Sequence, residues 1–172
     1  ASSAMSSAWI SYYAGLLGRL EGQLESLESM EDYTPSYLLR YGQAFISDGR
    51  GREALLLFRD LANDEALSPE LRQQAHYRWI LAEFFLRNWE ETLAVAIAFE
   101  EAYPESELAP ESLYLVAQAY QEQGKFRQAI EVYDELLNRF PDHSLAPRWL
   151  FTRGFNQSML EHYEEAREDF SR

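Results

Sequence analysis

The chain has 172 residues, of which 47% are hydrophobic and 26% charged, a composition that suits one globular domain rather than a disordered chain. Its net charge of −14 disfavours nucleic acid and anionic membrane surfaces as partners, because both carry negative charge. The absence of cysteine excludes disulfides, thiolate catalysis and zinc sites built on cysteine.

Residues 1–32 predict a flexible leader followed by one long helix over about residues 6–31. We expect this helix to cap the array that follows, and a dimerisation surface or the remnant of a preceding repeat are the alternatives. Its apolar stripe consists of Trp9, Tyr13, Leu16, Leu17, Leu20, Leu24 and Leu27.

Residues 33–172 contain an internal repeat. Aromatic, small and proline residues recur at a spacing of 37, since position 126 matches position 89 and position 163 matches position 126. A fixed period of this length indicates a helical-repeat array. The matched sets are Trp89, Thr92, Ala96, Phe99, Tyr103 and Pro104; Phe126, Ala129, Tyr133, Leu136, Phe140 and Pro141; and Tyr163, Ala166 and Phe170.

Each repeat predicts two helices joined by a tight turn. Leu113, Val116, Ala117 and Tyr120 stand at the i, i+3, i+4 and i+7 spacing of one helical face. Gly124 then suits the position just after a helix, where the backbone turns left-handed. The proline after each second helix cannot continue that helix, so it marks the start of the linker.

The unit that begins at Pro110 resembles the tetratricopeptide repeat, whose consensus positions are filled by Leu113, Val116, Ala117, Tyr120, Ala129, Tyr133 and Pro141. The unit from Pro35 fits as well apart from its end, the unit from about Gln74 is looser, and the last unit begins at Pro147. They depart at Ala66 in place of proline, at Thr92 in place of alanine, and at Arg153 and Gln157 in place of large apolar residues.

This resemblance implies an all-α fold: a right-handed superhelix of antiparallel helix pairs, with about four repeats over residues 33–172 and the last one truncated. The spacing of 37 with proline at both ends of the linker is similar to repeats of bacterial cell-envelope proteins. We therefore expect a location in the bacterial cell envelope, periplasmic or membrane-tethered.

The family lines the concave face of its superhelix with first helices, which implies a partner-binding groove. Several aromatic residues of this predicted groove are accompanied by arginine, a composition typical of protein-binding hot spots. Burial of these side chains by neighbouring helices is the alternative. The residues that the resemblance assigns to this groove are Leu39, Gln43, Arg78, Phe85, Tyr114, Gln118, Gln121, Arg148, Phe151 and Phe155.

No pattern in the sequence indicates catalysis, a cofactor or a metal. His76, His143 and His162 lack the i, i+4 spacing of paired metal ligands, and the acidic clusters fit solvated helix faces. The longest apolar runs, such as 93–99, are far shorter than the roughly 20 residues that span a bilayer, so we expect no direct membrane insertion.

The predicted function is therefore a protein-interaction scaffold that binds a partner protein or peptide and is not an enzyme. Because the predicted groove is largely apolar, an extended or helical apolar peptide suits it. The alternatives are a self-associating structural module, which makes a homo-oligomer, and a non-catalytic subunit of an envelope or polysaccharide-export complex.

The small residues of the repeat generate a first testable prediction. Ala117, Ala129, Gly154 and Ala166 stand where the two helices of a unit are expected to cross, about 8–10 Å apart. Ala129→Glu should abolish the cooperative thermal transition, because it buries a charge without a partner. Circular dichroism measures the melt, and an unchanged melt would contradict the assignment of helix pairs.

Overall fold

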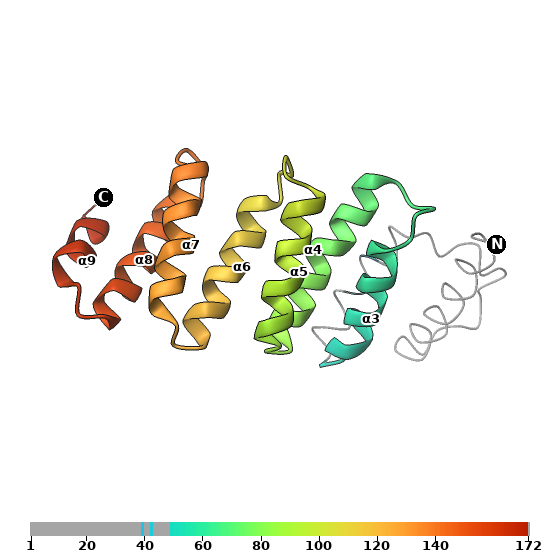
Figure 1. Cartoon of the computed structure of the whole chain (residues 1–172), viewed down its shortest axis with the longest axis horizontal. Coiled ribbons are helices and arrows are strands. Elements are labelled where there is room, and N and C mark those ends of the chain that lie inside the picture. The colour runs from blue at the N-terminus through green and yellow to red at the C-terminus, as the bar shows by residue number, and fades with distance from the viewer. Residues whose placement is uncertain (1–38, 40–41, 43–48, 172) are drawn as a thin grey trace. The chain divides into compact units, whose positions relative to one another are not determined.

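The computed structural model describes residues 39, 42 and 49–171 (Figure 1). These residues form seven α-helices and no strand, which confirms the all-α prediction. The predicted N-terminal helix and Gln43 lie outside the described residues. The chain divides after Leu86 into two units, Ala1–Leu86 and Arg87–Arg172.

The first unit contains α3 (Gly51–Ala62) and α4 (Pro69–Phe85), which pack against each other. Helix α3 buries Ala54, Leu57, Phe58 and Leu61 on one face, at the i, i+3, i+4 and i+7 spacing. Helix α4 begins five residues before Gln74, where the repeat pattern first appears. Its start is fixed by Pro69 in the first turn and by Ser68, whose Oγ accepts a hydrogen bond from the Leu71 N–H (3.4 Å).

The second unit contains α5 (Trp89–Ala102), α6 (Ala109–Glu122), α7 (Phe126–Arg139), α8 (Ala146–Met159) and α9 (Tyr163–Phe170). Each of these helices packs against the next along the chain, so that neighbours lie side by side (Figure 1). Residues of α6, α7 and α8 share one core, which is therefore continuous from one repeat to the next. The buried members are Leu113, Ala117, Ala129, Tyr133, Leu136, Ala146 and Trp149.

The two linkers of this unit have the same hydrogen bonds at positions 37 residues apart. In the linker over 103–108, the Leu108 N–H donates to the hydroxyl of Ser106 (2.9 Å). In the linker over 140–145, the Leu145 N–H donates to Nδ1 of His143 (3.2 Å). His143 also stacks on the Trp149 ring, with centroids 4.8 Å apart. This histidine is therefore a structural element of the linker.

The tight turn between paired helices uses a left-handed residue in every repeat. The positive φ angles are 74° at Gly49, 60° at Arg87, 70° at Gly124 and 65° at Glu161. A Cβ at either glycine would meet nothing within 4 Å, so glycine is favoured there by the backbone angle rather than by lack of space. The prediction for Gly124 is confirmed, and Arg87 and Glu161 adopt the same angle at an energetic cost.

The small positions predicted from the repeat are buried, and at Gly154 the structure shows a close approach of two helices. Ala117, Ala129 and Ala166 are buried. A Cβ added to Gly154 of α8 would lie 2.8 Å from Cε1 of Phe170 and 3.2 Å from the backbone oxygen of Ala166, both on α9. A larger residue at Gly154 would therefore push the two helices apart.

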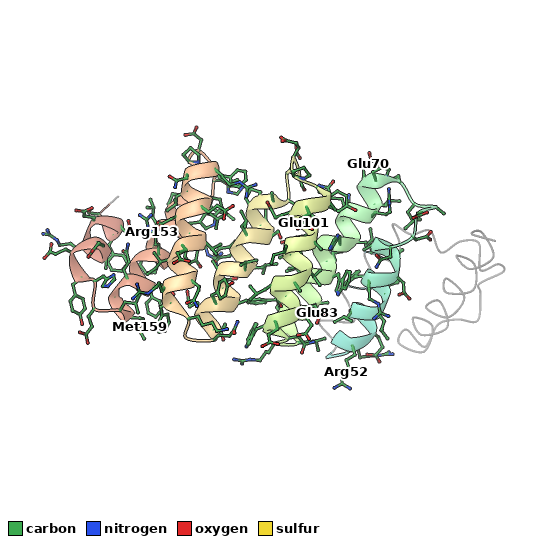
Figure 2. The ribbon with its side chains drawn as sticks, in the orientation of Figure 1. Arg52, Glu70, Glu83, Glu101, Arg153 and Met159 are labelled. Atoms are coloured by element: carbon green, nitrogen blue, oxygen red, sulfur yellow. The ribbon has the colours of Figure 1, made fainter. Side chains whose placement is uncertain are left out.

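Two departures from the repeat consensus are explained by polar contacts. Thr92 replaces the usual alanine and is fully buried, and its hydroxyl donates to the Asn88 carbonyl oxygen (2.9 Å). Arg153 of α8 (Figure 2) donates to both carboxylate oxygens of buried Asp169 on α9, at 2.7 and 2.5 Å, and to Asp134 on α7 at 2.6 Å. Hydrogen bonding to Asp169 is the main cause that raises the pKa of Arg153.

The left-handed turn at Glu161 generates a second prediction. Glu161→Gly should stabilise the chain by about 1 kcal/mol, because glycine adopts a positive φ without the Cβ clash. A shift of the urea midpoint to higher concentration measures this. The matched control is Gly124→Ala, which should lower the midpoint, and a lower midpoint for Glu161→Gly would contradict the argument.

The ion pair at Arg153 generates a third prediction. Arg153→Val should destabilise the chain by about 3 kcal/mol, because it leaves the buried Asp169 carboxylate without its partner. Urea denaturation measures the loss. The control is Arg153→Val/Asp169→Val, which gives α8 and α9 the valines that stand at the equivalent positions 37 residues earlier, Val116 and Val132. This double variant should recover most of the stability. Equal stability of the single variant and the wild type would show that the pair contributes nothing.

Candidate functional site

Tyr114 on α6 and Arg148 on α8 form the centre of the predicted binding surface in the second unit. The Arg148 guanidinium carbon lies 5.4 Å from the centroid of the Tyr114 ring, within reach of a cation–π contact. The Tyr114 hydroxyl accepts a hydrogen bond from Nε2 of Gln118 (3.1 Å). The Tyr114 ring also lies 6.2 Å from the ring of buried Tyr133. Tyr114 is therefore held from three sides and is half-buried.

Gln121 joins α6 to α8. Its Oε1 accepts a hydrogen bond from Nδ2 of Asn156 (2.9 Å), and the same nitrogen donates to the Thr152 carbonyl oxygen (2.7 Å). Asn156 is fully buried. Gln121 thus stabilises the contact between the two first helices, a role that its position in the family pattern did not indicate.

Phe151 and Phe155 are the most open part of this surface. They lie one helical turn apart on α8, on the same side as Arg148, and their side chains are 64% and 42% exposed. The Phe151 ring lies 5.4 Å from that of Phe170 on α9. The structure therefore brings six of the ten predicted residues together. We refer to them as the α6–α8 face: Tyr114, Gln118, Gln121, Arg148, Phe151 and Phe155.

The other predicted groove residues belong to the first unit or to undescribed positions. Leu39 is only 3% exposed, so it cannot contact a partner in this structure; its apolar side chain packs into the core instead. On α4, Arg78 is half-buried and Phe85 is exposed beside the ring of Phe84, 6.1 Å away. Apart from Leu39, the groove as one surface of the predicted residues stays a prediction.

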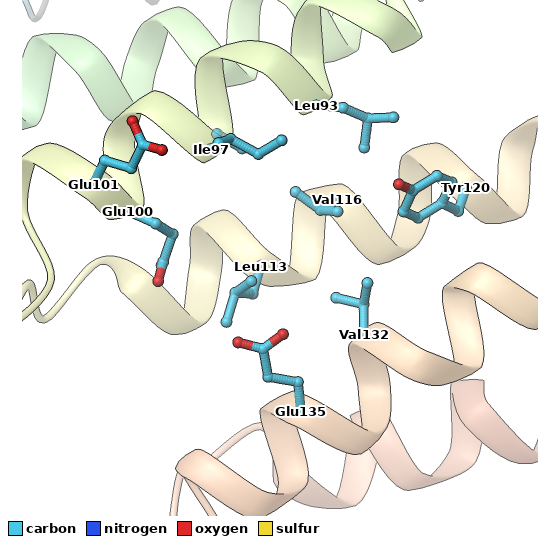
Figure 3. A pocket seen from close by; sticks show the side chains of 10 residues that line it. Leu93, Ile97, Glu100, Glu101, Leu113, Val116, Tyr120, Val132 and Glu135 are labelled. Carbon is cyan, nitrogen blue, oxygen red and sulfur yellow. The ribbon is translucent and has the colours of Figure 1, made fainter.

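An apolar pocket of about 320 Å³ lies among α5, α6 and α7, where the sequence predicted no site (Figure 3). Figure 3 shows Leu93 and Tyr120 at one end, and Glu100 and Glu101 at the other. At 100° per residue, the α6 side chains that line it point about 130° away from those of the α6–α8 face. The lining residues are Leu93, Ala96, Ile97, Glu100, Glu101, Leu113, Val116, Tyr120, Val132 and Glu135.

A signal for this pocket was present in the sequence. Helix α5 carries Ala94, Ile97 and Ala98 on its exposed side. Thirty-seven residues later, the equivalent positions of α7 hold Glu131, Asp134 and Glu135. Comparison of the repeats position by position on their outward faces, rather than on their core faces, would have indicated that α5 is unusual.

The hydroxyl of Tyr133 lies in the core that α6, α7 and α8 share. Burial raises the pKa of the Tyr133 hydroxyl above its usual range, so this group stays protonated. Among residues 39, 42 and 49–171, no group of three or more His, Asp or Glu side chains is arranged to hold a metal ion. None of the helices described in Figure 1 is both long and apolar enough to cross a membrane.

Helix pairs joined by left-handed turns, with a core continuous between repeats, define a helical-repeat protein of the α-solenoid class. Residues 111–143, which comprise most of α6, all of α7 and part of the following linker, match the sequence profile of the family described as "Tetratricopeptide repeat". The chain therefore contains a tetratricopeptide repeat, and the predicted resemblance is confirmed.

Solved structures support the same fold. MamA from Desulfovibrio magneticus RS-1 (residue 41 to the end) is 20% identical, with 83% of this chain and 75% of that chain covered and a TM-score of 0.64. The TPR-like repeats of a putative kinesin light chain from Podosopora anserina are 16% identical, with 79% and 72% covered and a TM-score of 0.64.

A further structure, MamA AMB-1, is 18% identical, with 94% of this chain and 84% of that chain covered and a TM-score of 0.61. At these identities the likeness establishes the fold alone. No curated protein sequence matched the chain significantly.

Proposed function

We propose that this chain is a protein-interaction scaffold whose α6–α8 face binds a partner protein or peptide within a larger assembly. The observation that carries the proposal is the exposure of Phe151 and Phe155 beside the stacked pair of Arg148 and Tyr114. Aromatic residues and arginine are enriched at protein interfaces and contribute much of the binding energy there.

The surface suits a partner with an apolar side chain and a hydrogen-bond acceptor close to it. Burial of a phenylalanine side chain contributes about 2 kcal/mol, so Phe151 and Phe155 supply most of the affinity. The Arg148 guanidinium keeps its donors free for a carbonyl or carboxylate oxygen, because its described contact is with the face of the Tyr114 ring. An extended or helical peptide with both features fits this arrangement.

The same proposal makes the chain a non-catalytic component. The polar residues that the structure describes in most detail have structural roles. His143 stacks on Trp149 beside its linker, Tyr133 lies in the core, and Arg153 pairs with Asp169. The 37-residue spacing with proline at both ends of the linker supports a place in a bacterial cell-envelope assembly.

Self-association is a second candidate function, favoured by the outer side of α9. Tyr163 and Phe170 are exposed there, although Tyr133, the residue 37 positions before Phe170, is fully buried under α8. A second copy could cover Phe170 as α8 covers Tyr133. Sedimentation velocity over a range of concentrations tests this, and a constant monomer mass would remove the candidate.

The α6–α8 face generates a fourth prediction. Phe151→Ala/Phe155→Ala should weaken capture of the partner from an extract of source cells by about tenfold or more, because the two rings supply the buried apolar area. Quantitative pull-down followed by mass spectrometry measures this. Tyr114 is left unchanged, since its ring also packs against Tyr133.

The matched control is Leu56→Ala on α3, which removes an exposed large apolar residue outside the α6–α8 face. Circular dichroism checks that all variants fold. If the double variant and the wild type retain the same proteins in equal amounts, or if the wild type retains none, the proposal for this face fails.

A further inference from the structure

Two equivalent three-helix junctions in the second unit are built in opposite ways. Where α7, α8 and α9 meet, Asp134, Arg153 and Asp169 form a closed network of ion pairs. Each of these residues has a counterpart 37 positions earlier, where α5, α6 and α7 meet, and the counterparts are Ile97, Val116 and Val132. All three line the apolar pocket of Figure 3. One junction is closed by its own charges, whereas the other is open and apolar.

The exposed side of α5 extends this apolar surface. Ile97 is 60% exposed, and Ala94 and Ala98 beside it are exposed as well. A helix that is apolar on most sides is normally buried, because exposure of apolar side chains to water is unfavourable. Exposed apolar surface of this kind beside a pocket marks a site of interaction.

The charges at one end of the pocket select the partner. Glu100, Glu101 and Glu135 line that end, and Arg139 pairs with the first (3.1 Å) and the last (2.7 Å). Three carboxylates against one guanidinium leave an excess of negative charge. In the described part of the chain, the second carboxylate oxygen of Glu100, Oε1, is buried and accepts no hydrogen bond. A buried acceptor of this kind is costly unless a donor reaches it.

We propose that this pocket is a second protein-binding site, which takes a basic amphipathic helix. Apolar side chains of that helix fill the space over Ile97, Val116 and Val132, and a lysine or arginine at one end donates to Glu100. From Leu93 to Glu101 the pocket extends about 12 Å along α5, which matches roughly two turns of a bound helix. Charge complementarity with the acidic end fixes the direction in which the helix lies.

This site is independent of the α6–α8 face. Its α6 residues Leu113, Val116 and Tyr120 lie on a different side of the helix from Tyr114 and Gln118. Loss of binding at one surface therefore leaves the other intact, and the two proposals fail separately.

The test uses two synthetic, fluorescein-labelled helical peptides of 14 residues. Both carry leucine at positions 4, 8 and 11, and they differ in having either lysine or glutamate at the flanking surface positions. Fluorescence anisotropy with the full chain should show the lysine peptide binding about tenfold more tightly than the glutamate peptide, because only lysine complements the acidic end.

Two variants locate the binding. Ile97→Asp gives α5 the residue that α7 has at the equivalent position, and Ile97→Asp/Val116→Arg/Val132→Asp copies the whole closed junction. Both variants should bind the lysine peptide about tenfold or more weakly than the wild type does. Glu100→Gln should reduce the preference for the lysine peptide over the glutamate peptide. Phe155→Ala on the α6–α8 face is the control and should leave binding unchanged. Circular dichroism checks that each variant folds. Ile97→Asp should perturb the core least, because Ile97 is exposed.

Equal affinity for the two peptides, absence of binding to the wild type, or binding that Ile97→Asp leaves unchanged would overturn the proposal. Sedimentation velocity without peptide separates a further outcome. If the wild type self-associates and Ile97→Asp abolishes this, the occupant is a second copy of the chain, and the assignment of a basic helix is wrong.

Discussion

The close approach of paired helices is the constraint on which the rest of this structure depends. Ala117, Ala129 and Ala166 are small and buried, and Gly154 leaves room for the backbone of α9, so large side chains pack around these positions. Tyr133 and Trp149 then fill the space between successive repeats. The same packing determines which sides of α6 and α8 remain exposed, and it therefore sets the position of both candidate binding surfaces.

The fold was predictable where a local rule decides the conformation. Proline ends a helix and Gly124 accepts a left-handed angle whatever surrounds them, and the repeat period shows that both recur. The left-handed angle at Glu161 was not visible, because glutamate carries no such preference and the packing of α8 against α9 imposes it. The role of Arg153 was missed for a similar reason. Its partners Asp134 and Asp169 lie on two other helices, and no local pattern connects the three.

The α6–α8 face followed from the family register, which assigns one side of each first helix to binding. That register placed Phe151 and Phe155 on one side of α8, where both are exposed, but it contains no information about burial by other elements, and Leu39 is buried. The pocket was not predicted, because the repeat pattern identifies the core residues of α5 and not those on its outward side. Ile97, Val116 and Val132 look like ordinary core positions until they are compared with Asp134, Arg153 and Asp169.

That comparison also bears on how such a protein diversifies. A repeat fixes its core positions, whereas the outer corner of each three-helix junction is free to change without loss of the fold. At one junction the corner is closed by a buried ion pair. Loss of either partner would leave an unpaired buried charge, which destabilises the chain. At the other it stays apolar and open, and exposed apolar surface gains free energy only when a partner covers it. Because α6 separates the open junction from the α6–α8 face, two partners bound there would be held about one helix diameter apart, roughly 10–12 Å. Helices of three successive repeats can in this way bring two proteins together, which is what a scaffold does.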